Sequence, residues 1–192
     1  MASFGIEGDS YWLHFCGGAV VSDHILITTA ECFFGLEANE RKVRFGSQKL
    51  NDDSAITYEI EKITPHPSYK GFGIKFDLAI VYTKSKITFS YRTMPISLPK
   101  IPNDDPYSYT NEEVKFSDWG YLNDRKIVSA TFKVLPESEC LSRHTYLRRR
   151  KSKDFFFCAG NVVSYFSTHL YSLYKITETR MAMQFKNYYF SV

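Results

Sequence analysis

Short runs of apolar and β-branched residues alternate with turn residues along most of this chain. No stretch has the period of a long amphipathic helix, although AECFFG is compatible with a single helical turn. The pattern therefore predicts an all-β architecture of the sandwich or barrel type. The runs with the length and composition of strands are GGAVVSDHILITTA, RKVRFGSQKL, ITYEIEKITPHPSY, FDLAIVYTKSKITF and VSATFKVLP.

Two stretches depart from this pattern. PKIPNDDPYSYTNEE is polar and rich in proline, which indicates a linker between a first and a second unit. After Gly160 the chain contains no Gly, Pro, Cys or Asp, so it lacks the usual turn residues. This last segment is either a genuine terminal strand or helix, or sequence foreign to the domain, such as read-through or an alternative exon. We favour the second interpretation because of the resemblance described below.

Composition narrows the range of functions. The chain has 192 residues, enough for one domain or two small ones, and a net charge of +3. So small a charge gives no reason to expect a nucleic-acid partner. No apolar run approaches the roughly 18 residues of a membrane span, so no span is predicted.

The four cysteines, Cys16, Cys32, Cys140 and Cys158, form two well-separated pairs. An even count suggests two disulfides and an oxidising compartment, whereas four free thiols in a cytosolic protein is the alternative. No CxxC spacing typical of zinc sites is present. The N-terminus lacks a basic start and an apolar signal-peptide run, so we expect that Met1 is not the native start.

Several motifs, taken in order, resemble one family. FCGGAVVS followed by LITTAEC is similar to the F-C-G-G-[SA]-L-I and L-T-A-A-H-C motifs of chymotrypsin/trypsin-like serine peptidases. Each motif alone is weak to moderate, but their common order makes the resemblance specific between Trp12 and Gly160. The further motifs, in the family's order, are PHPSY, FDLAIVY, MPISLP, SDWGYL, LPESECL and FFFCAG.

The resemblance implies a fold and a location. The family has two antiparallel β-barrels of six strands with the active site between them, and here the second barrel should be incomplete. It implies the disulfides Cys16–Cys32 and Cys140–Cys158, an extracellular location, and no cofactor or metal. The expected organisation is a first barrel at 1–102, a linker at 103–113, a partial second barrel at 114–160 and a non-family tail at 161–192.

The resemblance also places two members of the catalytic triad. Asp77, in FDLAIVY, takes the position of the triad aspartate, and Glu31, in TTAEC, takes that of the histidine. A free glutamate has a pKa of about 4.3 and is a poor base for a serine hydroxyl at neutral pH. If the two carboxylates face each other, they share a proton or hold a cation. Otherwise Glu31 turns to solvent.

The nucleophile is missing from its expected place. In the family, G-D-S-G-G follows shortly after C-A-G, but here C-A-G at Cys158–Gly160 is not followed by that stretch. A nucleophilic serine needs a sharp turn and adjacent N–H donors. The tail serines have no flanking glycine and do not meet this requirement: they are Ser164, Ser167, Ser172 and Ser191.

The other candidates are weaker. No histidine has a metal-ligand partner at i+2 or i+4, and His66 is expected to be structural. The basic run Leu147–Lys153 is either a solvated loop, a dibasic cleavage site, or a site for an acidic partner such as a sulfated glycan. The glycan would bind Arg148, Arg149, Arg150 and Lys151.

Taken together, the sequence predicts a truncated, non-catalytic homologue of trypsin-like peptidases. Its expected role is to bind protein partners or peptide-like ligands, as a decoy or regulator in extracellular proteolysis. The alternative is an active serine endopeptidase whose true C-terminus differs from the one in this sequence. A third possibility is a misspliced product without an independent role.

Overall fold

The computed structural model divides the chain into two compact units. The first is built mainly from Met1–Leu98 and Ser117–Val128, and the second from Pro99–Phe116 and Ser129–Ser191. The predicted boundaries at 102, 113 and 160 remain predictions, and much of the predicted linker lies outside the described residues. The structure describes residues 1–36, 38–71, 76–98, 109–119, 126–143, 156–160, 180–185 and 188–190.

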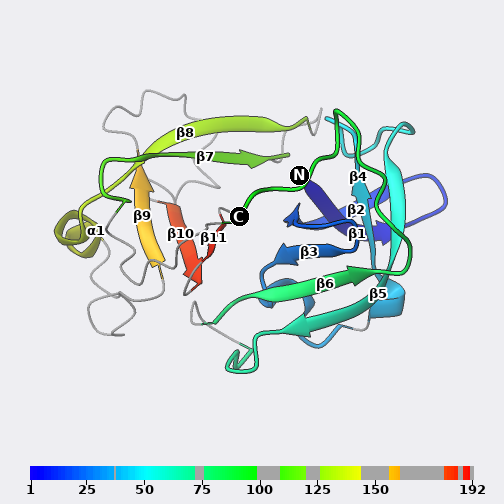
Figure 1. The fold of residues 1–192 in the computed structure, drawn as a ribbon, viewed down its shortest axis with the longest axis horizontal. Coiled ribbons are helices and arrows are strands. Elements are labelled where there is room, and N and C mark those ends of the chain that lie inside the picture. Colours follow the sequence, from blue (N-terminus) through cyan, green and yellow to red (C-terminus); the bar gives the residue numbers. More distant parts are fainter. Residues whose placement is uncertain are drawn as a thin grey trace. The chain divides into compact units, whose positions relative to one another are not determined.

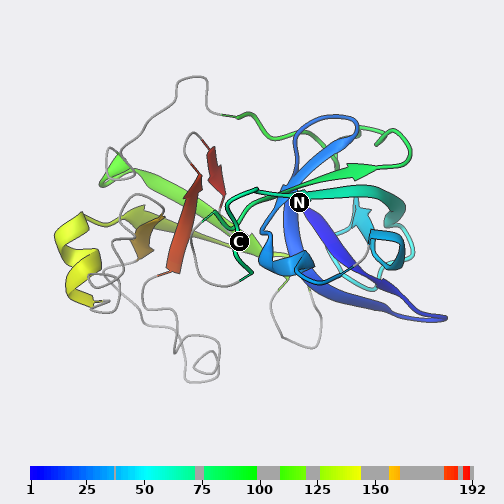
Figure 2. The same cartoon turned by 90° about the horizontal axis from the view of Figure 1, so that it is seen from below.

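Six strands of the first unit close into an antiparallel barrel (Figures 1 and 2). Around the barrel they follow the order β1-β2-β3-β6-β5-β4, so β6 joins the first three strands to the pair β4 and β5. Closure leaves no unpaired edge for another chain to extend. The bounds are β1 Ala2–Glu7, β2 Trp12–Val20, β3 Ile25–Thr28, β4 Lys42–Phe45, β5 Ile56–Pro65 and β6 Ala79–Thr83.

The barrel interior is an apolar core. Successive side chains of a strand point to opposite faces, and in β6 Ala79, Val81 and Thr83 are buried while the residues between them are more exposed. Gly18 lets β2 approach β3 closely, because a Cβ there would lie 2.8 Å from the Ile27 carbonyl oxygen. The buried members of the core are Ala2, Phe4, Val20, Leu26, Phe33, Val43, Phe45, Tyr58, Ile60, Val81 and Ile87.

A short 3-10 helix, Glu31–Phe33, follows β3 and confirms the helical turn expected in AECFFG. It is held from two sides. Phe33 is buried and meets the Phe4 ring edge-on, with centroids 5.1 Å apart, while the neighbouring Cys32 forms a disulfide with Cys16 of β2. The backbone at Glu31 is therefore fixed between a core side chain and a covalent link.

The second unit contains an open sheet in the order β11-β10-β9-β8-β7 (Figure 1). Its one described helix, α1, is tied to β9 by the disulfide Cys140–Cys158, and both cysteines are fully buried. No described helix is both long and apolar enough to cross a membrane. The bounds are β7 Glu113–Asp118, β8 Val128–Val134, α1 Glu137–Arg143, β9 Phe156–Gly160, β10 Arg180–Phe185 and β11 Tyr188–Phe190.

The two last strands come from the segment after Gly160. β10 pairs antiparallel with β9, with Arg180 opposite Ala159 and Met183 opposite Phe156, and β11 then pairs with β10. Strands of the unusual terminal segment thus extend the sheet of the second unit beyond β9. Whether this segment is foreign to the domain stays a prediction.

The predicted fold class is confirmed. The chain is all-β apart from short helices, its first barrel is complete, and its second barrel is incomplete over the residues that the structure describes. Both disulfides implied by the resemblance are present.

Replacing both Cys16 and Cys32 by serine should lower the free energy of unfolding by about 3 kcal/mol. The bridge spans 16 residues, and the chain-entropy model assigns a loop of this size about that value. Urea unfolding of the variant and of wild type would measure the loss. Repeating both titrations in reducing agent is the control, because the difference should then largely vanish. A loss below about 1 kcal/mol without reductant would contradict the prediction.

Candidate functional site

The pairing of two strands brings Glu31 and Asp77 together across 46 residues of sequence. β3 runs antiparallel to β6, with Thr28 opposite Ala79. Glu31 follows the end of β3 and Asp77 precedes the start of β6, so the register of this pair places the two segments side by side.

Asp77 is a fully buried carboxylate with two different oxygens. Its Oδ1 accepts a hydrogen bond of 2.7 Å from the backbone N–H of Glu31, and the backbone N–H of Ala30 donates to the same carboxylate. Its Oδ2 is buried and has no hydrogen-bond partner among the described residues. A buried acceptor without a hydrogen-bond partner is costly.

The electrostatics of the site follow from this geometry. Burial raises the pKa of Asp77 above its usual value, and the negative charge of Glu31 raises it further. The two backbone N–H groups oppose the rise because they stabilise the ionised form. Glu31 itself is exposed, and it contacts Asp77 through its backbone.

Tyr69 is a further member of this site that the sequence pattern did not single out. Its hydroxyl is buried without a hydrogen-bond partner in the described part of the chain. Burial raises the pKa of Tyr69, and the charges of Asp77 and then Glu31 add to the effect. Phe34 lies edge-on to the Tyr69 ring, with centroids 6.0 Å apart. Tyr69 lies within PHPSY, but nothing in that motif identifies its hydroxyl as buried near two acids.

The backbone before Asp77 is held in an uncommon conformation. Phe76 has a positive φ of 59°, and its ring stacks on His66 with centroids 4.8 Å apart. The His66 N–H donates to the Leu78 carbonyl at 2.7 Å, and its Nδ1 accepts from the Ser68 N–H at 3.1 Å. These contacts give His66 a structural role beside Asp77.

The remaining candidates are not brought to this site. His14 Nδ1 lies 2.8 Å from Ser3 Oγ, and His24 Nδ1 lies 3.2 Å from the Thr83 carbonyl oxygen. Within the described ranges no three His, Cys, Asp or Glu residues are placed to hold a metal ion. The basic run Leu147–Lys153 and the four tail serines lie outside the described residues, so the glycan site stays a prediction.

The variant Asp77→Asn should gain stability relative to wild type as the pH rises. Because the folded-state pKa of Asp77 is raised, the folded carboxyl holds its proton to higher pH than the unfolded one. Wild type therefore loses stability from about pH 4 upward, through the folded pKa, and the loss then levels off. Asparagine removes that titration. Urea unfolding of both proteins from pH 4 to 8 would measure the difference in their free energies of unfolding. A difference that does not change with pH, or that changes in favour of wild type as the pH rises, would contradict the raised pKa of Asp77.

Comparison with known proteins places the chain in a family. It matches the family described as Trypsin over residues 1–165. It is 28% identical to Trypsin Blo t 3 of Blomia tropicalis over 154 residues, which cover 77% of this chain and 56% of that protein. It is 24% identical to Hypodermin-B of Hypoderma lineatum, in a match that covers 67% of this chain and 50% of that protein. It is 28% identical to Serine protease 28 of Mus musculus, in a match that covers 59% of this chain and 41% of that protein. The chain spans about half the length of these relatives. It belongs to the trypsin family.

Proposed function

We propose that this chain is a non-catalytic member of the trypsin family that binds a protein or peptide partner in extracellular proteolysis. One observation carries the proposal. The carboxylate of Asp77 is buried, with the backbone N–H of Glu31 at Oδ1 and no partner at Oδ2 in the described structure, beside an exposed Glu31. By resemblance, Asp77 takes the position of the triad aspartate and Glu31 that of the triad histidine.

The chemistry of a serine peptidase needs an imidazole at position 31. One ring nitrogen would donate its N–H to Asp77 Oδ2, and the other would accept the proton of the serine hydroxyl. An ionised glutamate has no proton to donate, and its negative charge adds to that of Asp77. The unpartnered Oδ2 and the raised pKa of Asp77 are what we expect where this imidazole is replaced by an acid.

The nucleophile is a second, independent loss. G-D-S-G-G occurs nowhere in the sequence, so no serine has the flanking glycines of the family's nucleophile. Losing any member of the triad lowers the rate by several orders of magnitude, and these losses are not additive. Restoring the base alone would therefore not restore catalysis.

A binding role is consistent with what the chain retains. The first barrel is closed, its core is packed, and its disulfide is formed. Disulfides persist in oxidising compartments, which supports an extracellular location. A stable scaffold without its catalytic groups is suited to hold a partner that active relatives would cleave or bind.

The alternative, a serine endopeptidase with a different C-terminus, has one observation in its favour. The chain covers only 41% to 56% of the length of its relatives, so a large part of each relative has no counterpart in this sequence. Glu31 would still leave such a protein without its base.

A biotinylated fluorophosphonate, which labels activated serines, should not react with this protein. We expect the same result for Glu31→His, because the variant regains a base but has no nucleophile. An active trypsin-family peptidase under the same conditions serves as the positive control. Labelling of wild type that heat denaturation abolishes would contradict the loss of catalysis.

The binding role predicts a specific partner in the extracellular fluid of the source organism. The immobilised protein should retain that partner reproducibly, and a reduced and unfolded sample of the same chain should not. If no protein is retained above the unfolded control, the binding role is wrong, and the interpretation of a product without an independent role gains support.

A further inference from the structure

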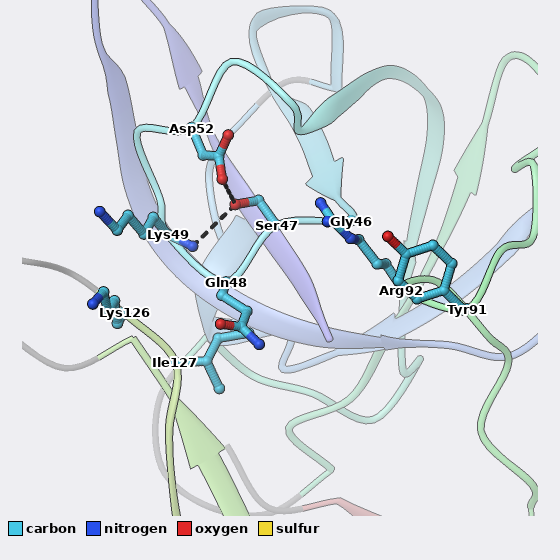
Figure 3. A pocket seen from close by; sticks show the side chains of 9 residues that line it. All are labelled: Gly46, Ser47, Gln48, Lys49, Asp52, Tyr91, Arg92, Lys126 and Ile127. Carbon is cyan, nitrogen blue, oxygen red and sulfur yellow. Dashed lines mark hydrogen bonds between the residues drawn. The ribbon is translucent and has the colours of Figure 1, made fainter.

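A second site lies in the first unit, apart from Asp77. It is a pocket of about 520 Å³, a volume within the usual range for ligand sites. We call it the basic pocket because three cations line it. Figure 3 shows Lys49 and Lys126 on one side of the pocket and Arg92 beside Tyr91 on the other. The lining residues are Gly46, Ser47, Gln48, Lys49, Asp52, Tyr91, Arg92, Lys126 and Ile127.

One wall of the basic pocket is a braced loop. Gly46 has a φ of +86°, a conformation that glycine adopts without strain, and starts the loop after β4. Ser47 Oγ donates to Asp52 Oδ2 at 2.6 Å, and the Ser54 N–H donates to Asp52 Oδ1 at 2.9 Å. The Lys49 N–H in turn donates to Ser47 Oγ at 3.0 Å, so the backbone that carries Lys49 is fixed.

Asp52 is the only carboxylate among the described lining residues, and this loop already engages it. Hydrogen bonds from Ser47 and Ser54, with a smaller effect from the charge of Arg92, lower the pKa of Asp52 to about 2. Asp52 therefore stays ionised at physiological pH, while its two oxygens accept hydrogen bonds from the loop. It braces the pocket, and the described lining holds more cations than carboxylates.

A segment distant in sequence lies beside this loop on the same side of the pocket. The Ile127 N–H donates to the Gln48 carbonyl at 2.8 Å, and Lys49 and Lys126 form an isolated antiparallel bridge. These backbone contacts set two lysines from different parts of the chain next to each other. Such like charges repel, which favours an anion between or beside them.

The third cation is paired with an exposed aromatic ring. The guanidinium carbon of Arg92 lies 5.2 Å from the centroid of the Tyr91 ring, and Tyr91 is 86% exposed. Neither Lys49 nor Arg92 makes an ion pair within the described part of the chain. The basic pocket thus offers exposed cations and an uncovered apolar ring face together.

A small neighbouring cavity adds an uncharged donor. It shares Ser47 and Lys49 with the basic pocket, and its volume of about 10 Å³ is close to that of one water. Trp119 lines it, is 4% exposed, and has an indole N–H without an acceptor among the described residues. An indole nitrogen only donates, so this group needs an acceptor, and the cavity has room for one the size of a water molecule.

We propose that the basic pocket binds an acidic peptide segment of a protein partner. The carboxylates would lie against Lys49, Lys126 and Arg92, and an apolar side chain would cover the Tyr91 ring. A peptide can combine a few carboxylates with a large apolar side chain, which matches a few cations beside an exposed aromatic ring better than the dense charge of a sulfated glycan does. The inference rests on the binding part of the proposed function and is independent of the loss of catalysis.

The test uses the full chain and a fluorescein-labelled peptide in which glutamates flank a single phenylalanine. Fluorescence anisotropy should show binding that weakens as salt is raised. Lys49→Glu combined with Arg92→Glu should weaken binding at least about tenfold, since reversal replaces attraction by repulsion. Lys49→Gln combined with Arg92→Gln should give a smaller loss of affinity, and this variant replaces the first one if charge reversal unfolds the protein.

Two controls are needed. The first distinguishes an effect of the pocket residues from an effect of net charge, and the second shows whether the Tyr91 ring contributes to binding beyond the charges. Lys62→Glu with Lys133→Glu makes the same change in net charge at exposed positions outside the pocket and should leave the affinity within about twofold. Tyr91→Ala should weaken the binding of the peptide that contains phenylalanine, but not the binding of a matched peptide in which alanine replaces that phenylalanine.

Three results would overturn the proposal: no binding of the peptide, an equal loss in both double reversal variants, or tighter binding of a size-matched heparin fragment that depends on Lys49 and Arg92. Each is distinguishable from failure of the proposed function. A partner retained from extracellular fluid by wild type and by the pocket variants alike would support the binding role while excluding this pocket.

Discussion

The antiparallel pairing of β3 with β6 is the interaction on which the candidate site depends. It sets Thr28 opposite Ala79, and this register carries the backbone N–H of Glu31 to within 2.7 Å of Asp77 Oδ1. The disulfide of Cys32 with Cys16 and the burial of Phe33 hold the same turn from the other side. The backbone is therefore fixed independently of the side chain at position 31, so a change of that side chain leaves the contact of its N–H with Asp77 in place.

This fixed backbone explains how a site can keep its geometry and lose its chemistry. Two backbone N–H groups stabilise the Asp77 carboxylate whatever residue occupies position 31, but they leave Oδ2 without a partner in the described structure. The resulting cost falls on a barrel whose core and closure are intact. A closed barrel tolerates one carboxylate with an unsatisfied oxygen, because the cost of roughly a few kcal/mol is small against the burial of many apolar side chains.

The sequence predicted the elements whose residues alternate strongly and missed those that depend on tertiary pairing. The run ITYEIEKITP became β5 and the alternation at Ala79–Thr83 became β6, as expected. β1 was missed because ASFGIE contains a glycine and too few β-branched residues to signal a strand. The seven residues of α1 are too few to display a helical period.

The residues of the candidate site could be predicted where they lie in motifs that resemble the family. They could not be predicted where only the folded structure brings them together. Asp77 and Glu31 were found through their motifs, but the buried hydroxyl of Tyr69 depends on packing that no local pattern encodes. The same holds for the basic pocket. Lys49, Arg92 and Lys126 are isolated cations in sequence, and only the bridge between two distant segments and the loop after β4 bring them together.

Peptide mass spectrometry of the native protein would distinguish a non-catalytic chain from a peptidase in one experiment, because it reads the positions of the base and of the nucleophile together. A non-catalytic protein should yield a peptide that carries Glu31, together with the terminal peptides ITETR and MAMQFK, and no peptide with G-D-S-G-G. A native protein in which a G-D-S-G-G peptide replaces the terminal ones, and histidine replaces Glu31, would contradict the loss of catalysis.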